Sequence, residues 1–339
     1  MTHFQSVHYA RAAAALMVVV FHIHTTTSLM RPDADAVAWL KGGVDIFFVI
    51  SGFVMVKATT DKAISPLDFF KRRCQRIIPL YWLATVVTMT TIDGEWLFKL
   101  GSMLFFPMAN PQSGAWQPVV EPGWTLNYEM FFYLLFAISL TIKPKWRFGA
   151  LGALLAGFAF LSLIAPPKSL VGFYANPIVL EFLFGMMIAK YNIRGSAFLV
   201  PVGLLAMYLL YPLEVPRLIS LGLPAAIIIV GAVGSEAKVG SSRLLTLLGD
   251  ASYSIYIFHL VALSIFVTYW SKIGLSKVYF VPTAVLFIVV VAVAIHWLLE
   301  RPIIACFARI NTQSAPRRSR NTEFSTLSRQ NSSAAFKTE

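Results

Sequence analysis

Three ionisable side chains interrupt apolar stretches of the sequence, and their types suit acid–base chemistry. His22 lies within LMVVVFHIH, Asp45 within GGVDIFFVIS and Glu129 within WTLNYEMFFY. A carboxylate beside an imidazole fixes its tautomer and raises its basicity, which is the arrangement that general-base catalysis uses. A proton or ion path would use the same residues. These side chains therefore indicate either a catalytic site or a proton relay.

Arg11 precedes His22 on the same apolar segment. At about 100° per residue, the spacing brings His22 back to within about 20° of the direction of Arg11, about 16 Å further along the helix. Ala15 and Val18 lie between them on this narrow face, whereas His24 points to nearly the opposite side. An ionisable group at membrane depth is by default a site hypothesis. The alternative is that His22 merely forms a hydrogen bond to a neighbouring helix.

Composition places the chain in a membrane. Of its 339 residues, 57% are hydrophobic and 13% are charged, and the mean hydropathy is +0.69. The apolar residues fall in blocks that suit a hydrocarbon core of about 30 Å, which takes roughly 20 helical residues to cross. We expect an all-α polytopic membrane protein with about ten transmembrane helices at 1–310. The polar, basic residues 311–339 are expected to form a disordered cytoplasmic tail.

The expected spans are 9–27, 41–57, 77–93, 124–142, 148–165, 177–190, 197–212, 217–234, 251–270 and 279–299, with 97–109 as a re-entrant or interfacial piece. With the N-terminus inside, the inner segments hold 21 of the 28 Lys and Arg residues. An excess of basic residues in cytoplasmic loops sets the orientation of a membrane protein. Both termini are therefore expected in the cytoplasm. The net charge of +12 follows from this topology and does not indicate nucleic-acid binding.

The three ionisable groups are expected at a similar depth. His22, Asp45 and Glu129 lie four or five residues below the outer ends of their spans, which is roughly 6–8 Å along a helix. A charge at the centre of a membrane helix costs roughly 2.5–3.5 kcal/mol on insertion scales, and somewhat less nearer the surface. We therefore expect the three groups to pair with one another around a polar cavity.

The most basic loop directly precedes the third expected span. Ser65 as N-cap, Pro66 at the first helical position and Asp68 after them predict a helix start. The helix would continue through FFKRRCQRIIPLYW, in which Arg73 and Arg76 share a face because they are three residues apart. Attraction to anionic lipid headgroups is the alternative reading of these two arginines.

In combination and in order, these motifs resemble the acyltransferase-3 family of membrane acyltransferases, and within it the ExoZ-type exopolysaccharide acetyltransferases. The matching features are Arg11 with His22 after it, GVDIFFVISGF, RRCQRIIPLYW, WTLNYE, EFLFG, GDASYSIYIFH and ERP. Thr125 stands where the family often has Ser. The resemblance covers the chain to about Arg309.

The resemblance implies transfer of an acyl group, usually acetyl, from cytoplasmic acyl-coenzyme A to a sugar hydroxyl. It makes His22 the catalytic base and places Arg11, Arg73 and Arg76 at the donor. Guanidinium groups bind phosphates in bidentate fashion, which agrees with this role. Asp45 and Glu129 are expected to complete the catalytic site. Both direct transfer and an acyl-enzyme intermediate are compatible with these residues.

The expected surroundings are the bacterial inner membrane and its lipid, with a polysaccharide or lipid-linked oligosaccharide as acceptor. Neither a metal nor nucleic acid is expected. The alternative function is a transporter or flippase for a lipid-linked sugar, with His22, Asp45 and Glu129 as a proton relay. Many transporters consist of two related halves, and the sequence shows no internal repeat, which favours the enzyme.

Overall fold

The computed structural model describes residues 4–27, 30–60, 64–90, 95–166, 168–273 and 276–313. Within these ranges the regular structure is α-helix with short 3-10 and π turns, and there is no strand. The predicted all-α class is therefore confirmed. The chain divides into two units, Met1–Glu300 and Arg301–Glu339.

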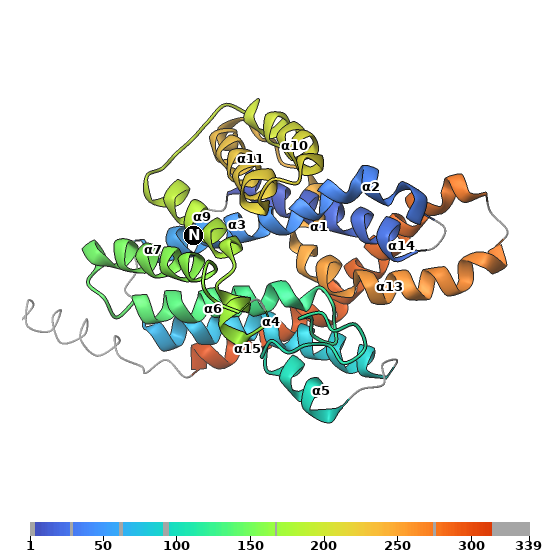
Figure 1. Ribbon diagram of the computed structural model, residues 1–339, viewed down its shortest axis with the longest axis horizontal. Helices are drawn as coiled ribbons and strands as arrows, with labels where there is room; N and C mark the ends of the chain where they lie inside the picture. The colour runs from blue at the N-terminus through green and yellow to red at the C-terminus, as the bar shows by residue number, and fades with distance from the viewer. Residues whose placement is uncertain are drawn as a thin grey trace, which may run out of the picture. The chain divides into compact units, whose positions relative to one another are not determined.

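The first unit contains most of the helices (Figure 1). They are α1 (Gln5–Thr26), α2 (Ala34–Val37), α3 (Gly43–Thr59), α4 (Pro66–Met89), α5 (Trp96–Met103), α6 (Gly123–Ser139), α7 (Pro144–Leu161), α8 (Leu170–Tyr174), α9 (Leu180–Lys190), α10 (Leu199–Leu210), α11 (Leu223–Gly234), α12 (Arg243–Asp250), α13 (Ser252–Ile273) and α14 (Phe280–Ile295). Two π turns, η5 (Leu218–Gly222) and η8 (His296–Glu300), precede α11 and follow α14.

Each of the ten expected spans overlaps one of these helices. Four helical stretches of the described chain are long and apolar enough to cross a membrane on their own, namely Gln5–Thr26, Ala34–Thr59, Ser252–Trp270 and Lys277–Ile310. Leu199–Leu213 and Leu218–Gly234 are shorter apolar helices. The number of ten spans stays a prediction.

The second unit is described by itself. Its helix α15 (Arg301–Gln313) begins at the Arg of the ERP motif and continues past the predicted boundary at residue 310. The remainder of the expected tail, 314–339, lies outside the described residues.

Helix α1 is the central element of the first unit. It packs against α3, α11, α12, α13 and α14 (Figure 1). Its contact with α3 is close, because a Cβ atom built on Gly43 would lie 2.3 Å from the carbonyl oxygen of Ala14. Small residues permit such close approach of membrane helices. Gly43 is therefore needed for the fit of α3 against α1.

A distant carboxylate caps the N-terminus of α1. Glu236 accepts hydrogen bonds from the backbone N–H groups of Gln5 and Ser6, at 2.7 and 2.9 Å, and from the Ser6 hydroxyl at 2.5 Å. These donors would otherwise lack an intrahelical partner, and the negative charge also suits the positive end of the helix dipole. The cap fixes the end of α1 nearest Arg11.

Helix α4 begins where the sequence predicts. Ser65 Oγ accepts a hydrogen bond from the backbone N–H of Asp68 at 3.1 Å, and Pro66 is the first helical residue. The helix then runs without a break through the basic stretch and Pro79 to Met89. One continuous helix thus carries Arg73 and Arg76 toward the expected third span.

The expected apolar piece at 97–109 forms the short helix α5 and a return loop on α4. The Tyr81 hydroxyl donates to the carbonyl of Ser102 at 2.9 Å, and the Trp82 indole donates to the carbonyl of Met103 at 2.8 Å. Trp96 at the start of α5 remains exposed. With eight residues, α5 is too short to span a membrane.

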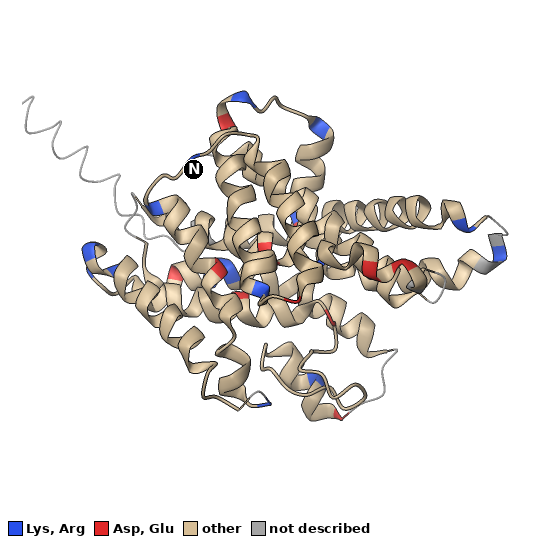
Figure 2. Ribbon diagram, turned by 45° about the horizontal axis from the view of Figure 1, so that its top comes forward, with Lys and Arg blue, Asp and Glu red and all other residues tan. Residues whose placement is uncertain are grey.

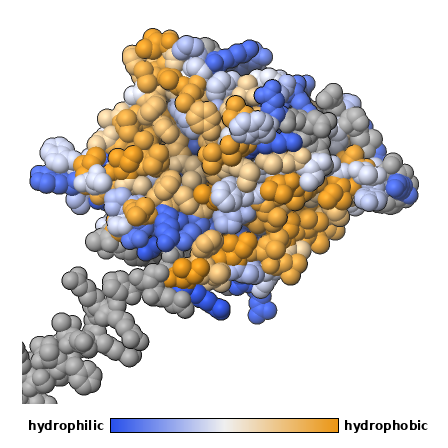
Figure 3. Space-filling model, turned by 90° about the horizontal axis from the view of Figure 1, so that it is seen from below, coloured by the Kyte–Doolittle hydropathy of each residue, from blue (hydrophilic) through white to orange (hydrophobic). Residues whose placement is uncertain are grey.

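The surface of the first unit carries many exposed apolar side chains. Val86 on α4, Ile138 on α6, Phe160 on α7, Leu209 on α10 and Leu286 on α14 are examples, and Figure 3 shows broad apolar areas on one face. Charged residues lie mainly in loops and at helix ends (Figure 2). Such extensive apolar exposure suits contact with lipid hydrocarbon rather than with water.

Asp45 on α3 forms a bidentate ion pair with Arg217, which directly precedes η5. Arg217 Nε lies 3.0 Å from Asp45 Oδ1, and Nη2 lies 2.7 Å from Oδ2. The Asp45 side chain is fully buried, and that of Arg217 is 32% exposed. The guanidinium also lies over the Trp124 ring at 5.8 Å. The ion pair and the contact with Trp124 thus connect α3, the segment before η5 and α6, which are distant in sequence.

Glu181 on α9 is a second buried carboxyl group in this region. A Cβ atom built on Gly222 would lie 2.9 Å from Glu181 Oε1. Neither carboxyl oxygen of Glu181 has a hydrogen-bond partner among the described residues. Gly222 is the last residue of η5, which directly follows Arg217, so Glu181 lies beside the element that carries the partner of Asp45.

The predicted topology can be tested with reporter fusions. A fusion after Arg309 should be active only as a cytoplasmic probe, because basic residues are retained on the cytoplasmic side. A fusion after Gln112, in the exposed loop between α5 and α6, is the matched control and should be active only outside. A periplasmic signal from the fusion after Arg309 would contradict the topology.

The Asp45–Arg217 pair predicts a strong mutual dependence in stability. Arg217→Gln alone should destabilise the protein by about 3–5 kcal/mol, because the buried Asp45 carboxylate loses its partner. Asp45→Asn should destabilise it less, because the guanidinium left behind is 32% exposed. The double variant should recover part of this loss. Thermal unfolding in detergent, followed by size-exclusion chromatography, measures the effect. Asp35→Asn, at an exposed position, is the control; equal melting temperatures for Asp45→Asn and the wild type would contradict the ion pair.

Candidate active site

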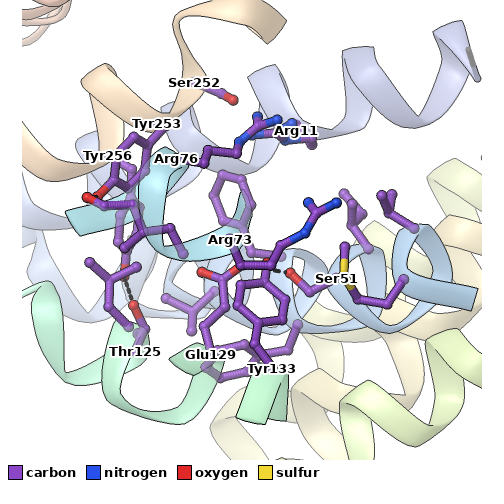
Figure 4. Close-up of a pocket in the computed structure, with 18 residues that line it drawn as sticks. Arg11, Ser51, Arg73, Arg76, Thr125, Glu129, Tyr133, Ser252, Tyr253 and Tyr256 are labelled. Atoms are coloured by element: carbon purple, nitrogen blue, oxygen red, sulfur yellow. Dashed lines mark hydrogen bonds between the residues drawn. The ribbon is translucent and has the colours of Figure 1, made fainter. Parts of the chain in front are cut away.

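Helices α1, α3, α4, α6 and α13 enclose a cavity with about 830 Å³ of empty space, open solvent at its mouth included. Figure 4 shows its polar lining. These residues are Arg11, Ser51, Arg73, Arg76, Thr125, Glu129, Tyr133, Ser252, Tyr253 and Tyr256. Four of the six residues expected at the site, Arg11, Arg73, Arg76 and Glu129, therefore line one cavity.

The three arginines form the positive part of the lining. Arg11 comes from α1, and Arg73 and Arg76 come from consecutive turns of α4 (Figure 4). In the described part of the chain, none of them forms an ion pair with a carboxylate within 4.0 Å. Arg76 is exposed, whereas Nε of Arg73 is buried without a hydrogen-bond partner among the described residues. The cavity thus contains uncompensated positive charge.

Aromatic rings support Arg73. Its guanidinium lies 5.5 Å from the ring centroid of Phe69 and 5.9 Å from that of Tyr133. A cation over an aromatic face is stabilised by the ring quadrupole without losing its charge. The rings therefore hold the guanidinium in place while its N–H groups stay available to a ligand.

Glu129 lies on the donor side of the expected site, among the arginines (Figure 4). Its Oε1 accepts hydrogen bonds from the hydroxyl of Ser51 at 3.0 Å and from the hydroxyl of Tyr133. Glu129 lines the same cavity as Arg11, Arg73 and Arg76. One carboxylate thus balances only part of the charge of three guanidinium groups.

The partner of His22 is another histidine. His22 Nδ1 on α1 lies 3.1 Å from His259 Nε2 on α13, and the ring centroids are 4.7 Å apart. His22 Nδ1 also lies 2.9 Å from the carbonyl of Val18, and His259 Nδ1 lies 2.6 Å from the carbonyl of Tyr256. His259 is 1% exposed. The two rings therefore form a histidine pair between α1 and α13.

This arrangement corrects the expected pairing of His22 with Asp45 and Glu129. Asp45 is bonded to Arg217, Glu129 to Ser51 and Tyr133, and His22 to His259. The similar depth estimated from span boundaries says nothing about which helix faces meet. Charged groups at one depth can each find a different partner, and here they do.

The narrow face between Arg11 and His22 is also occupied differently from what the sequence suggests. Ala15 and Val18 are buried. Ala15 packs in a cluster with Ala251 of α12–α13, and a Cβ atom built on Gly43 would lie 3.0 Å from Val18. Small side chains on this face let neighbouring helices approach instead of leaving a channel. Space for a ligand lies in the adjoining cavity.

Tyr256 connects the cavity with the histidine pair. Its side chain lines the cavity, its carbonyl accepts the hydrogen bond of His259, and its ring centroid lies 6.1 Å from that of His259. The Tyr256 hydroxyl is 2.8 Å from Thr125 Oγ1. His22 itself does not line the cavity.

Within its predicted span, His259 is expected from the sequence to form a hydrogen bond between helices, and the structure shows such a contact with His22. The sequence identified neither this partner nor the roles of Tyr256 and Arg217. His259 and Tyr256 occur in SYSIYIFH at a spacing of three, so they share a face of α13. That spacing is a signal for a joint role, but it does not identify His22 as the partner. Arg217 was expected at the outer end of its span, where a basic residue is ordinary.

Known proteins are similar to this chain over most of its length. The family model described as Acyltransferase domain (Acyl_transf_3) matches residues 4–301. The exopolysaccharide production protein ExoZ of Rhizobium meliloti is 34% identical over 285 residues, which cover 77% of this chain and 89% of that protein. No solved structure matches the chain.

Two further relatives match over shorter regions. The O-acetyltransferase OatA of Staphylococcus aureus is 29% identical over 163 residues, which are 40% of this chain and 25% of that protein. The O-acetyl transferase of Shigella phage Sf6 is 25% identical over 207 residues, covering 56% of this chain and 58% of that protein. The matches favour the enzyme over the transporter. The chain therefore belongs to the acyltransferase-3 family and is a membrane O-acyltransferase.

Proposed function

We propose that this chain transfers an acetyl group from cytoplasmic acetyl-coenzyme A to a sugar hydroxyl of an exopolysaccharide or its lipid-linked precursor. The bacterial inner membrane would hold the enzyme. The names of the relatives support both parts, since one is an exopolysaccharide production protein and another an O-acetyltransferase. His22 is the general base in this proposal.

The excess positive charge of the cavity is the main support for a phosphate-bearing donor. Three guanidinium groups face one space with a single carboxylate, Glu129, among them. Holding such charges together at the edge of a membrane is costly unless an anion joins them. Coenzyme A carries phosphates, which guanidinium groups bind through two parallel N–H donors. Arg11, Arg73 and Arg76 would hold these phosphates.

The position of these arginines on α4 gives the donor a direction. Arg73 and Arg76 lie in the first half of α4, and Arg76 is exposed. The basic stretch that contains both is expected at the cytoplasmic surface. The nucleotide would therefore stay near the cytoplasm, and the thioester would point toward Tyr256 and the histidine pair.

The reaction needs one base, which also returns the proton. A thioester supplies an activated acetyl group. Nε2 of His22 removes the proton of the acceptor hydroxyl while that oxygen attacks the thioester carbonyl carbon. A C–O bond forms, the C–S bond breaks, and the leaving sulfur takes the proton back from His22. The products are an O-acetyl ester and a free thiol.

In this proposal, neither Asp45 nor Glu129 is a partner of His22, and each has a different role. Glu129 orders the donor cavity, because it accepts from Ser51 and Tyr133 on its walls. Asp45 acts through the fold, because its carboxylate is fully engaged by Arg217. Glu129→Gln should therefore disturb donor binding more than proton transfer.

The role of His22 predicts a large and specific loss of activity. A general base contributes about 10²–10⁴-fold to the rate, so His22→Ala should nearly abolish acetylation. His24→Ala is a matched control, because Nδ1 of His24 also bonds the carbonyl four residues back, that of Val20, at 2.8 Å. Acetate on surface glycan, measured at equal membrane abundance, is the readout. Wild-type acetylation in His22→Ala, or equal loss in both variants, would refute the base assignment.

The role of Arg73 and Arg76 predicts which kinetic constant changes. Replacing either with Ala should raise KM for acetyl-coenzyme A about tenfold, because each charged hydrogen bond contributes roughly 1.5–3 kcal/mol. Lys should rescue only in part, since it lacks the planar fork of the guanidinium. The control is Arg72→Ala, at an exposed neighbour that does not line the cavity. Unchanged KM in both Ala variants would make these residues lipid anchors.

A further inference from the structure

The histidine pair carries an inference that rests on the proposed role of His22 as general base. We propose that His259 is a positioning residue for His22. Its Nε2 accepts a hydrogen bond from the Nδ1–H group of His22, which keeps Nε2 of His22 unprotonated and able to act as the base. It also stabilises His22 after proton uptake.

The carbonyl of Tyr256 fixes the tautomer of His259. Nδ1 of His259 lies 2.6 Å from this oxygen, and a carbonyl oxygen can only accept a hydrogen bond. Nδ1 of His259 therefore carries the proton. In the neutral ring, Nε2 then has a lone pair and serves as an acceptor, and it is this atom that faces His22.

Two hydrogen-bond acceptors likewise fix the tautomer of His22, with the proton on Nδ1. Its Nδ1 lies 2.9 Å from the carbonyl of Val18 and 3.1 Å from Nε2 of His259. Neither atom can donate, so the proton is on Nδ1 of His22 and is shared between them. Nε2 of His22 is consequently unprotonated. A general base needs this nitrogen in its unprotonated form.

His24 provides a comparison within the same helix. Its Nδ1 also bonds the carbonyl four residues back, at 2.8 Å, yet it has no imidazole partner among the described residues. The local backbone contact is therefore common to both histidines. The contact with His259 is what distinguishes His22.

The pair also explains how a proton can be held at this buried place. When Nε2 of His22 takes the acceptor proton, the ring becomes an imidazolium, and its Nδ1–H becomes a charged donor. The lone pair of His259 can strengthen its bond to such a donor, and charge-assisted hydrogen bonds are roughly twice as strong as neutral ones. The Val18 carbonyl lies within the backbone ladder of α1, so it is the poorer of the two acceptors.

Tyr256 holds His259 relative to the donor cavity. Its carbonyl orients the His259 ring, while its side chain lines the cavity and its hydroxyl contacts Thr125. The chain of contacts from Thr125 through Tyr256 and His259 to His22 thus joins the cavity wall to the base. His259 lies in the middle of this chain and is buried.

Side-chain amides of two lengths can test this role. The amide oxygen of Gln can replace Nε2 of a histidine, whereas that of Asn lies near the position of Nδ1. In His259→Gln, an acceptor therefore remains for His22. In His259→Asn, no acceptor remains at that position, although Asn and Gln are similar in size and polarity. His259→Leu removes both contacts.

The full chain in lipid nanodiscs should be assayed with acetyl-coenzyme A and chemically de-O-acetylated polysaccharide from the producing strain. His259→Gln should keep kcat within about threefold of wild type. His259→Asn and His259→Leu should lower it at least about tenfold, a fraction of the 10²–10⁴-fold contribution of a base. KM for acetyl-coenzyme A should change little in all three variants, because His259 does not line the donor cavity.

Other outcomes separate this inference from the proposed function. Equal kcat for the Gln and Asn variants, or effects on KM alone, would overturn the positioning role. If His22→Ala keeps wild-type kcat, the base assignment itself fails. If only His22→Ala loses activity and all His259 variants are normal, His22 remains the base and the role of His259 falls.

A measurement on the wild type covers the case in which the variants do not fold. Nitrogen-15 spectra of histidine-labelled protein distinguish protonated from unprotonated ring nitrogens, with His22→Ala used to assign the signals. We expect a protonated Nδ1 and an unprotonated Nε2 for His22. The opposite tautomer would overturn the inference.

Discussion

The cost of placing charge in a medium of low polarity organises this structure. A buried ion without a partner destabilises a protein by several kcal/mol, so an ionisable group is favoured where it is paired, open to water or available to a ligand. The buried carboxyl group of Glu181 is an exception, since it has no hydrogen-bond partner among the described residues. Asp45 and Arg217 pair fully with each other. Glu129 is satisfied by Ser51 and Tyr133. The arginines of the cavity have no carboxylate ion pair in the described chain, and they mark the place for an anion.

In the proposed mechanism, the same constraint separates the place where the donor binds from the place of proton transfer. Positive charge gathers in the cavity beside α4, whereas the histidine pair lies between α1 and α13. A cation next to a base would disfavour its protonation, so distance between the two serves the reaction. Tyr256 joins the two parts, since its side chain belongs to one and its carbonyl to the other. Helix α1 contributes to both, with Arg11 and His22 at separate depths.

Sequence patterns predicted the helices better than their contacts. The apolar blocks indicated the all-α class, and the cap at Ser65 follows from local chemistry that involves neighbouring residues only. The grouping of Arg11, Arg73 and Arg76 came from a family resemblance and from spacing on single helices, whereas Glu129 was expected beside His22 and Asp45 and lies with the arginines instead. The partners of His22 and Asp45 could not be predicted, because His259 and Arg217 lie far along the chain. Period and depth determine which face a residue occupies but do not identify the helix that covers that face.

A structure with a bound, non-transferable analogue of acetyl-coenzyme A would test the central claim most directly. The protein in nanodiscs, imaged by electron cryomicroscopy, should show the analogue's phosphates against Arg11, Arg73 and Arg76. The acetyl end should extend past Tyr256 toward the histidine pair. It should lie within hydrogen-bond distance of a hydroxyl group that is bound at Nε2 of His22. Phosphates bound away from these arginines, or an acetyl group on the opposite side of α1, would contradict the account.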